Sequence, residues 1–145
     1  MEAHTQATEL SRMATNILWC HVEVEHACDA LAEQQQALPP DLAQTVADFV
    51  RLCRYYIHIG MGQLIPVSTE RPAGLALPRH TDIVSAMLAG VSVLTKIATT
   101  AHLIRTNDKG ALPRAAFEAL RQVETLADPF QYVTQGEDPW KNIRQ

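Results

Sequence analysis

Apolar residues recur every seven positions through the first part of the chain. The series is Leu10, Ile17, Val24, Leu31 and Leu38, with Met13, Cys20 and Ala27 beside it. This spacing keeps one apolar face along an α-helix for about eight turns. It predicts a long helix over residues 5–36 whose apolar face is buried against other elements.

The same periodicity returns in three later segments. They span residues 41–64, 81–106 and 113–127. The first helix is expected to end before Pro39 and Pro40, because proline lacks an amide hydrogen and restricts the residue before it. Asp41 is the expected N-cap of the second helix. Gly60 and Gly62 weaken the last turns of that helix, where they either permit a close helix crossing or fray the end.

Four helices of unequal length predict an all-α fold, a four-helix up-down bundle with a long first helix. A proline-rich loop over residues 66–79 joins the second helix to the third, and an aromatic tail follows the fourth. We expect residues 1–145 to form a single domain, with the tail at 128–145 acting as an arm or a strap. The fourth helix can cover only part of the first, so apolar surface remains for the tail or for another subunit. This mismatch predicts self-association as a homodimer.

The composition narrows the class of protein. A net charge of −4 argues against a dedicated nucleic-acid binder, which usually has a basic excess. The three cysteines are Cys20, Cys28 and Cys53. They form no C-x-x-C pair, which favours buried free thiols in a reducing compartment. The start of the chain lacks a signal-peptide pattern, and the apolar stretch 83–104 is interrupted by Lys96, short of a membrane span. We therefore expect a cytoplasmic protein with no membrane partner and no cofactor.

A polar cluster lies on the second predicted helix. Its members are Arg51, Arg54, Tyr55 and His58. Their spacing of three, four and seven residues places them on one helix face. Two guanidinium groups, a phenol and an imidazole are suited to hold a phosphate or a carboxylate of a partner. The alternative is an ordinary solvated face with helical ion pairs, for example between Asp48 and Arg51.

The same segment resembles a motif of a known enzyme family. Arg51 and His58 are separated by six residues in the run Arg-Leu-Cys-Arg-Tyr-Tyr-Ile-His, which resembles the Arg-x4–6-His motif of HEPN-domain ribonucleases. Members of that family are small helical bundles that usually dimerise. The resemblance implies metal-independent RNA cleavage by Arg51 and His58 at a dimer cleft, with RNA as the partner. Leu52 departs from the family pattern, which often has a polar residue after the arginine.

A histidine falls inside the apolar series of the first predicted helix. His21 lies between Ile17 and Val24, with Glu25 one turn later. A buried histidine needs a hydrogen-bond partner, which Glu25 or a residue on another helix can supply. A second alternative function is therefore a small-ligand or metal-binding bundle, with His21 and Glu25 as candidate ligands near His102.

Trp19 lies on the side of the first predicted helix opposite the apolar series. Tryptophan is favoured in interfaces because it combines a large apolar area with a polar handle. Trp140 in the tail presents the same choice between a covered residue and a partner contact. We therefore expect a non-enzymatic, self-associating helical protein–protein interaction module, such as an adaptor, regulator, chaperone or small assembly subunit. The expected partner- or anion-binding residues are Arg51, Arg54, Tyr55, His58, Trp19 and Trp140.

Overall fold

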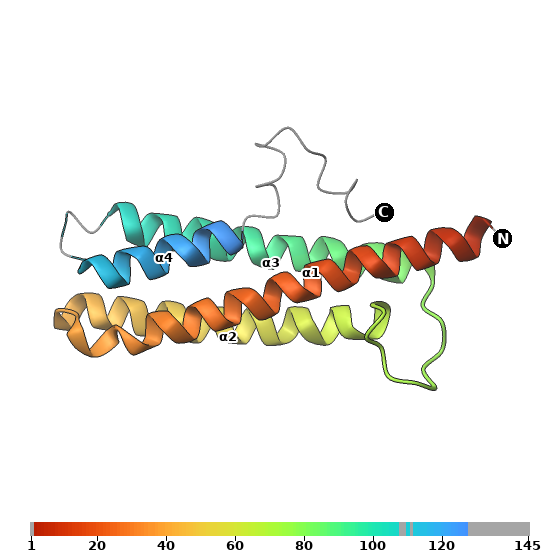
Figure 1. Ribbon diagram of the computed structural model, residues 1–145, viewed down its shortest axis with the longest axis horizontal. Helices are drawn as coiled ribbons and strands as arrows, with labels where there is room; N and C mark the ends of the chain where they lie inside the picture. The colour runs from red at the N-terminus through yellow and green to blue at the C-terminus, as the bar shows by residue number, and fades with distance from the viewer. Residues whose placement is uncertain (1, 108–109, 111, 128–145) are drawn as a thin grey trace.

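The chain folds into α-helices that pack against one another (Figure 1). A computed structural model describes residues 2–107, 110 and 112–127, and within these residues it contains no β-strand. The elements are α1 (Glu2–Glu33), η1 (Gln35–Ala37), α2 (Pro40–Leu64), η2 (Ile65–Val67), α3 (His80–Thr106) and α4 (Arg114–Leu126), where η marks a short 3-10 helix. The predicted all-α class is confirmed.

The helices differ in length and in how much of the molecule they cover. α1, α2 and α3 pack against one another, and α4 packs against both α1 and α3. Figure 1 shows α4 beside the C-terminal half of α3. α4 has 13 residues and α3 has 27, so α4 is about 20 Å shorter at 1.5 Å per residue. The N-terminal halves of α1 and α3 therefore extend beyond α4.

Two predicted helix ends differ from the observed ones. α1 ends at Glu33, before the predicted residue 36, and η1 forms a separate turn. Asp41 is not the N-cap of α2, because Pro39 has the extended backbone of a cap and Pro40 begins the helix. Proline is favoured at this first position, where no amide hydrogen is needed. Asp41 instead lies in the first turn, where a carboxylate stabilises the positive end of the helix dipole.

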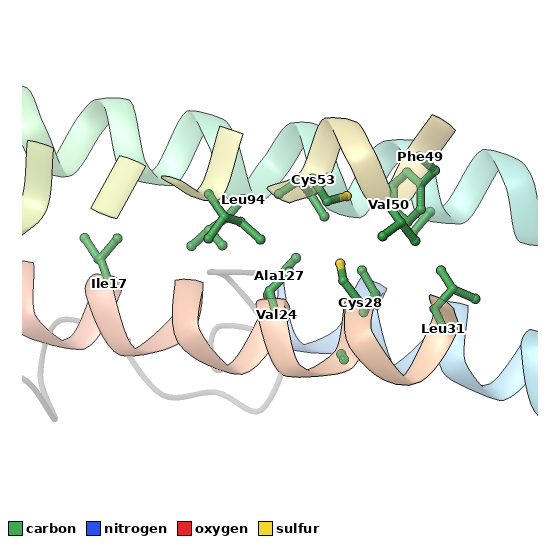
Figure 2. Packing of buried hydrophobic residues seen from close by; sticks show 14 of the residues in the cluster. Ile17, Val24, Cys28, Leu31, Phe49, Val50, Cys53, Leu94 and Ala127 are labelled. Atoms are coloured by element: carbon green, nitrogen blue, oxygen red, sulfur yellow. The ribbon is translucent and has the colours of Figure 1, made fainter. Parts of the chain in front are cut away.

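The predicted seven-residue series forms the core face of α1. Ile17, Val24 and Leu31 are buried on α1, and Leu10 is partly buried against the same core. Leu38, the last member of the series, is buried just after η1. Figure 2 shows the α1 side chains opposite those of α2 and α3. The labelled partners are Phe49, Val50 and Cys53 of α2, Leu94 of α3, and Ala127 after α4. Burial of these side chains removes apolar surface from water and is the main stabilising term in such a fold.

α3 is the one helix in the described part of the chain that meets the length and hydropathy expected of a membrane span. Its most apolar 18-residue window has a mean hydropathy of 1.6, and 33% of that window is buried inside the protein. Length and composition alone therefore do not support the expectation that this stretch falls short of a span. A core helix passes the same test, and α3 packs against α1, α2 and α4.

Candidate functional site

The predicted polar cluster lies on the exposed side of α2, and both of its arginines are paired. Arg51 Nη2 donates to Asp48 Oδ1 at 2.9 Å, and Arg54 Nη2 donates to Asp29 Oδ1 of α1 at 2.6 Å. The side chains of all four partners are at least half exposed. An anion that binds here must compete with two aspartates, so the cluster is not a preformed cationic site. The predicted pairing of Asp48 with Arg51 is observed.

An apolar row runs along the same helix and shares Tyr55 with this cluster. Leu52, Tyr55 and Ile59 are 53%, 62% and 38% exposed, and their spacing of three and four residues places them on one face of α2. We call these three residues the apolar strip. Tyr55 packs edge-on against Tyr56, with ring centroids 5.6 Å apart. Lys96 Nζ of α3 lies 4.5 Å from the centre of the Tyr56 ring.

The two residues that resemble the ribonuclease motif also lie on the exposed side of α2. Arg51 and His58 are exposed, and their separation of seven residues corresponds to about 10 Å along the helix axis. Arg51 is held by Asp48 within the same helix. A cleft that contains an arginine and a histidine from each of two subunits stays a prediction.

His21 is completely buried between two glycines of neighbouring helices. Its Nδ1 lies 2.8 Å from the carbonyl oxygen of Ile17, and since a carbonyl only accepts, Nδ1 carries the hydrogen. Nε2 then has an unshared electron pair and has no hydrogen-bond partner in the described part of the chain. A Cβ on Gly60 would lie 2.5 Å from Nε2, and one on Gly90 would lie 3.4 Å from Cε1. The imidazole ring therefore fills the space where α1, α2 and α3 meet.

The surroundings of His21 argue for a structural role. Burial lowers the pKa of His21 below its ordinary value, although the hydrogen bond to Ile17 opposes this effect. Ile17, and not Glu25, accepts its hydrogen bond. Among the described residues, no three His, Cys, Asp or Glu side chains lie close enough together to hold a metal ion. His21 and Glu25 therefore have no third ligand in this part of the molecule.

His102 belongs to a different cluster, which joins α3 to α4. Its Nδ1 lies 2.8 Å from Oε1 of Glu124, and Nε of Arg105 donates to Oε2 of Glu124 at 2.8 Å. The hydrogen bond from Arg105 is the main reason that the pKa of Glu124 lies below its ordinary value. Arg105 also lies over the ring of Phe117. His102 is twelve residues beyond Gly90, about 18 Å along α3, so His21 and His102 do not share a site.

The remaining predicted partner surfaces are only partly described. Trp19 is 51% exposed on the outer side of α1, so it is not covered within the described molecule. In the connection between η2 and α3, Leu75 and Leu77 are also exposed. Trp140 and the predicted tail at 128–145 lie outside the described residues. Leu52 and Ile59 are not among the partner-binding residues predicted from the sequence, although their spacing with Tyr55 is visible in it.

No protein-family model, no curated protein and no solved structure matches this chain. The side chains themselves are therefore the only guide to a function. The distinguishing surface feature is a row of large apolar side chains on an exposed helix, flanked by arginines that are already paired with aspartates.

Proposed function

We propose that this protein is a non-enzymatic helical interaction module that self-associates as a homodimer in the cytoplasm, and that serves as an adaptor, regulator, chaperone or assembly subunit. In this proposal the helices form an up-down bundle with a long loop between α2 and α3. The observation that supports it is the apolar strip. An outer face of a bundle helix is normally polar, whereas a contiguous row of exposed apolar side chains marks an interaction surface.

The magnitudes define what the strip contributes to a dimer. Full burial of an apolar side chain stabilises by about 1.5–3 kcal/mol, and each strip residue is already partly buried, so about 1 kcal/mol remains for each. Six such side chains from two copies contribute about 6 kcal/mol. The loss of translational and rotational freedom on association costs about as much or more. The strip is therefore the centre of a larger interface, and further surface must contribute.

The charges beside the strip favour a second copy of the chain as the partner. Asp48 and Arg51 place both signs of charge next to the apolar residues. In a twofold interface the same patch contacts itself, so Arg51 of one copy can reach Asp48 of the other. Such ion pairs between the two copies are exposed, so they fix the orientation of the dimer more than they raise its affinity.

Sedimentation velocity of the full chain over the micromolar range tests the proposal. The wild-type protein should change from monomer to dimer as its concentration rises. Leu52→Gln with Ile59→Gln should remain monomeric at concentrations where the wild type is dimeric. Leu88→Gln is the matched control, because Leu88 is also an exposed helical leucine and lies on α3. A wild-type monomer at every concentration, or equal dimerisation of the strip variant, would contradict the proposal.

A further inference from the structure

The groove that α4 occupies continues past the end of α4. Gln34, directly after α1, lines the contact with α4, and Met13 and Cys20 of α1 precede it at seven-residue multiples. On α3, Arg105 pairs with Glu124 of α4, and Val84 and Val91 precede Arg105 at the same spacing. Residues seven apart stay on one helix face with little drift. The N-terminal halves of α1 and α3 therefore present a continuation of the same groove.

This continuation is apolar. Its residues, which we call the open seam, are Met13, Cys20, Val84, Leu88 and Val91. Leu88 is 66% exposed and the other four are partly buried. Under α4, by contrast, the corresponding face of α3 carries His102 and Arg105. The face of α3 therefore becomes more apolar where α4 no longer covers it. An exposed apolar surface of this kind is typical of a place where another segment binds.

The chain itself supplies a segment at the right place. α4 ends at Leu126, and Ala127 is completely buried. Residues 128–145 follow directly, and they include Phe130 and Tyr132. The seam extends about 20 Å beyond α4, and a chain of this length reaches up to about 60 Å when extended. A tethered segment is present at an effective concentration near millimolar, which favours it over a second copy at micromolar concentration.

We propose that residues 128–145 dock on the open seam of their own molecule and complete the side of the bundle that α4 leaves uncovered. In an extended chain, Phe130 and Tyr132 point to the same side, so both rings can contact Leu88 and its neighbours. This proposal does not depend on the homodimer.

Cys20 is a natural reporter for this contact. It is a partly buried residue of the seam, whereas Cys28 and Cys53 are completely buried. The sulfurs of Cys28 and Cys53 face each other in the core (Figure 2), and their hydrogen bond together with burial raises the pKa of Cys53. An aromatic disulfide reagent should therefore react in the native protein with Cys20 alone, and Cys20→Ala should abolish the reaction.

The experiment compares reaction rates of Cys20 in the full chain. Phe130→Ser with Tyr132→Ser should accelerate the reaction about five-fold. This factor is expected if the wild-type tail is docked ~80% of the time, because Cys20 then reacts only during the remaining ~20%. Gln131→Ser with Thr134→Ser is the matched control and should leave the rate unchanged. Leu88→Gln, which alters the seam from the opposite side, should also accelerate the reaction. Mass by sedimentation should be the same for the tail variant and the wild type.

Two results would overturn the tail proposal. Equal Cys20 rates in the wild type and the aromatic variant would show that these rings do not cover the seam. A wild-type rate that falls as protein concentration rises would identify a second copy as the cover. Neither result bears on the apolar strip, whose test is the mass of the Leu52→Gln and Ile59→Gln variant.

Discussion

The glycines at positions 60 and 62 of α2 form a matched pair with opposite surroundings. Both lie within the helix, and neither has the positive φ that would exclude alanine. A Cβ on Gly60 would lie 2.5 Å from Nε2 and 2.9 Å from Cδ2 of His21, whereas one on Gly62 would meet nothing within 4 Å. We predict that Gly60→Ala destabilises the protein and that Gly62→Ala stabilises it.

The magnitudes follow from two opposing effects. Alanine in place of glycine stabilises a helix by about 0.5–1 kcal/mol, and at Gly62 this is the whole effect. At Gly60 the new methyl group overpacks the core, which costs about 1–3 kcal/mol. The imidazole of His21 has little room to move, because a Cβ on Gly90 at its other side would lie only 3.4 Å away. The expected net loss at Gly60 is about 1 kcal/mol, which separates the two variants by about 2 kcal/mol.

Urea denaturation of the two variants and the wild type measures this difference as a change in midpoint at constant slope. In thermal unfolding, 1 kcal/mol corresponds to about 3 °C for a chain of this size. A double-mutant cycle with His21→Ala isolates the contact. In the His21→Ala background, Gly60→Ala should stabilise as Gly62→Ala does. Equal stabilisation by the two alanines in the wild-type background would refute the close approach of His21 to α2.

Two further predictions concern titration and ion pairing. Because the pKa of His21 is lowered in the folded protein, the unfolded chain binds more protons than the folded protein below about pH 6.5. As the pH is lowered through this range, the free energy of unfolding should fall by up to about 1.4 kcal/mol per pH unit. This slope should disappear in His21→Gln, measured by urea denaturation between about pH 7 and pH 5; the lowered pKa of Glu124 adds its own loss only below about pH 4.5. Arg105→Ala should lower stability by about 1–2 kcal/mol, since Arg105 makes two hydrogen bonds to a partly buried carboxylate and covers Phe117. Arg51→Ala should change it by less than about 0.5 kcal/mol, because its ion pair is exposed; equal effects of the two alanines would contradict this reasoning.

The helices could be predicted from sequence because their signal is local. A seven-residue apolar series places its members on one face whatever the rest of the chain does, and Ile17, Val24 and Leu31 are buried as expected. Helix ends depend on competition between adjacent residues. Asp41 is a good capping residue, but Pro39 takes the N-cap position and Pro40 begins the helix, so the cap lies two residues before Asp41.

The site was predictable only where it depends on one helix. The shared face of the α2 cluster follows from spacing, and so does the burial of His21. The contacts between helices do not, because they depend on how one helix is rotated and shifted against the next. Arg54 meets Asp29 of α1, and His21 meets Gly60 and Gly90. The sequence left Gly60 and Gly62 with the same two interpretations, a close crossing or a frayed end, and the position of α1 decides that Gly60 lies at the crossing.

The unequal helix lengths give two surfaces that can be tested separately. The open seam exists because α4 covers only half of α3, and its residues lie on α1 and α3. The apolar strip lies on α2, so a longer α4 would cover the seam without reaching the strip. Leu52→Gln should therefore change the mass of the particle and leave the reaction rate of Cys20 unchanged, while Leu88→Gln should do the reverse. If either substitution changed both quantities, the strip and the seam would be parts of one continuous interface, and the short fourth helix would be the cause of self-association.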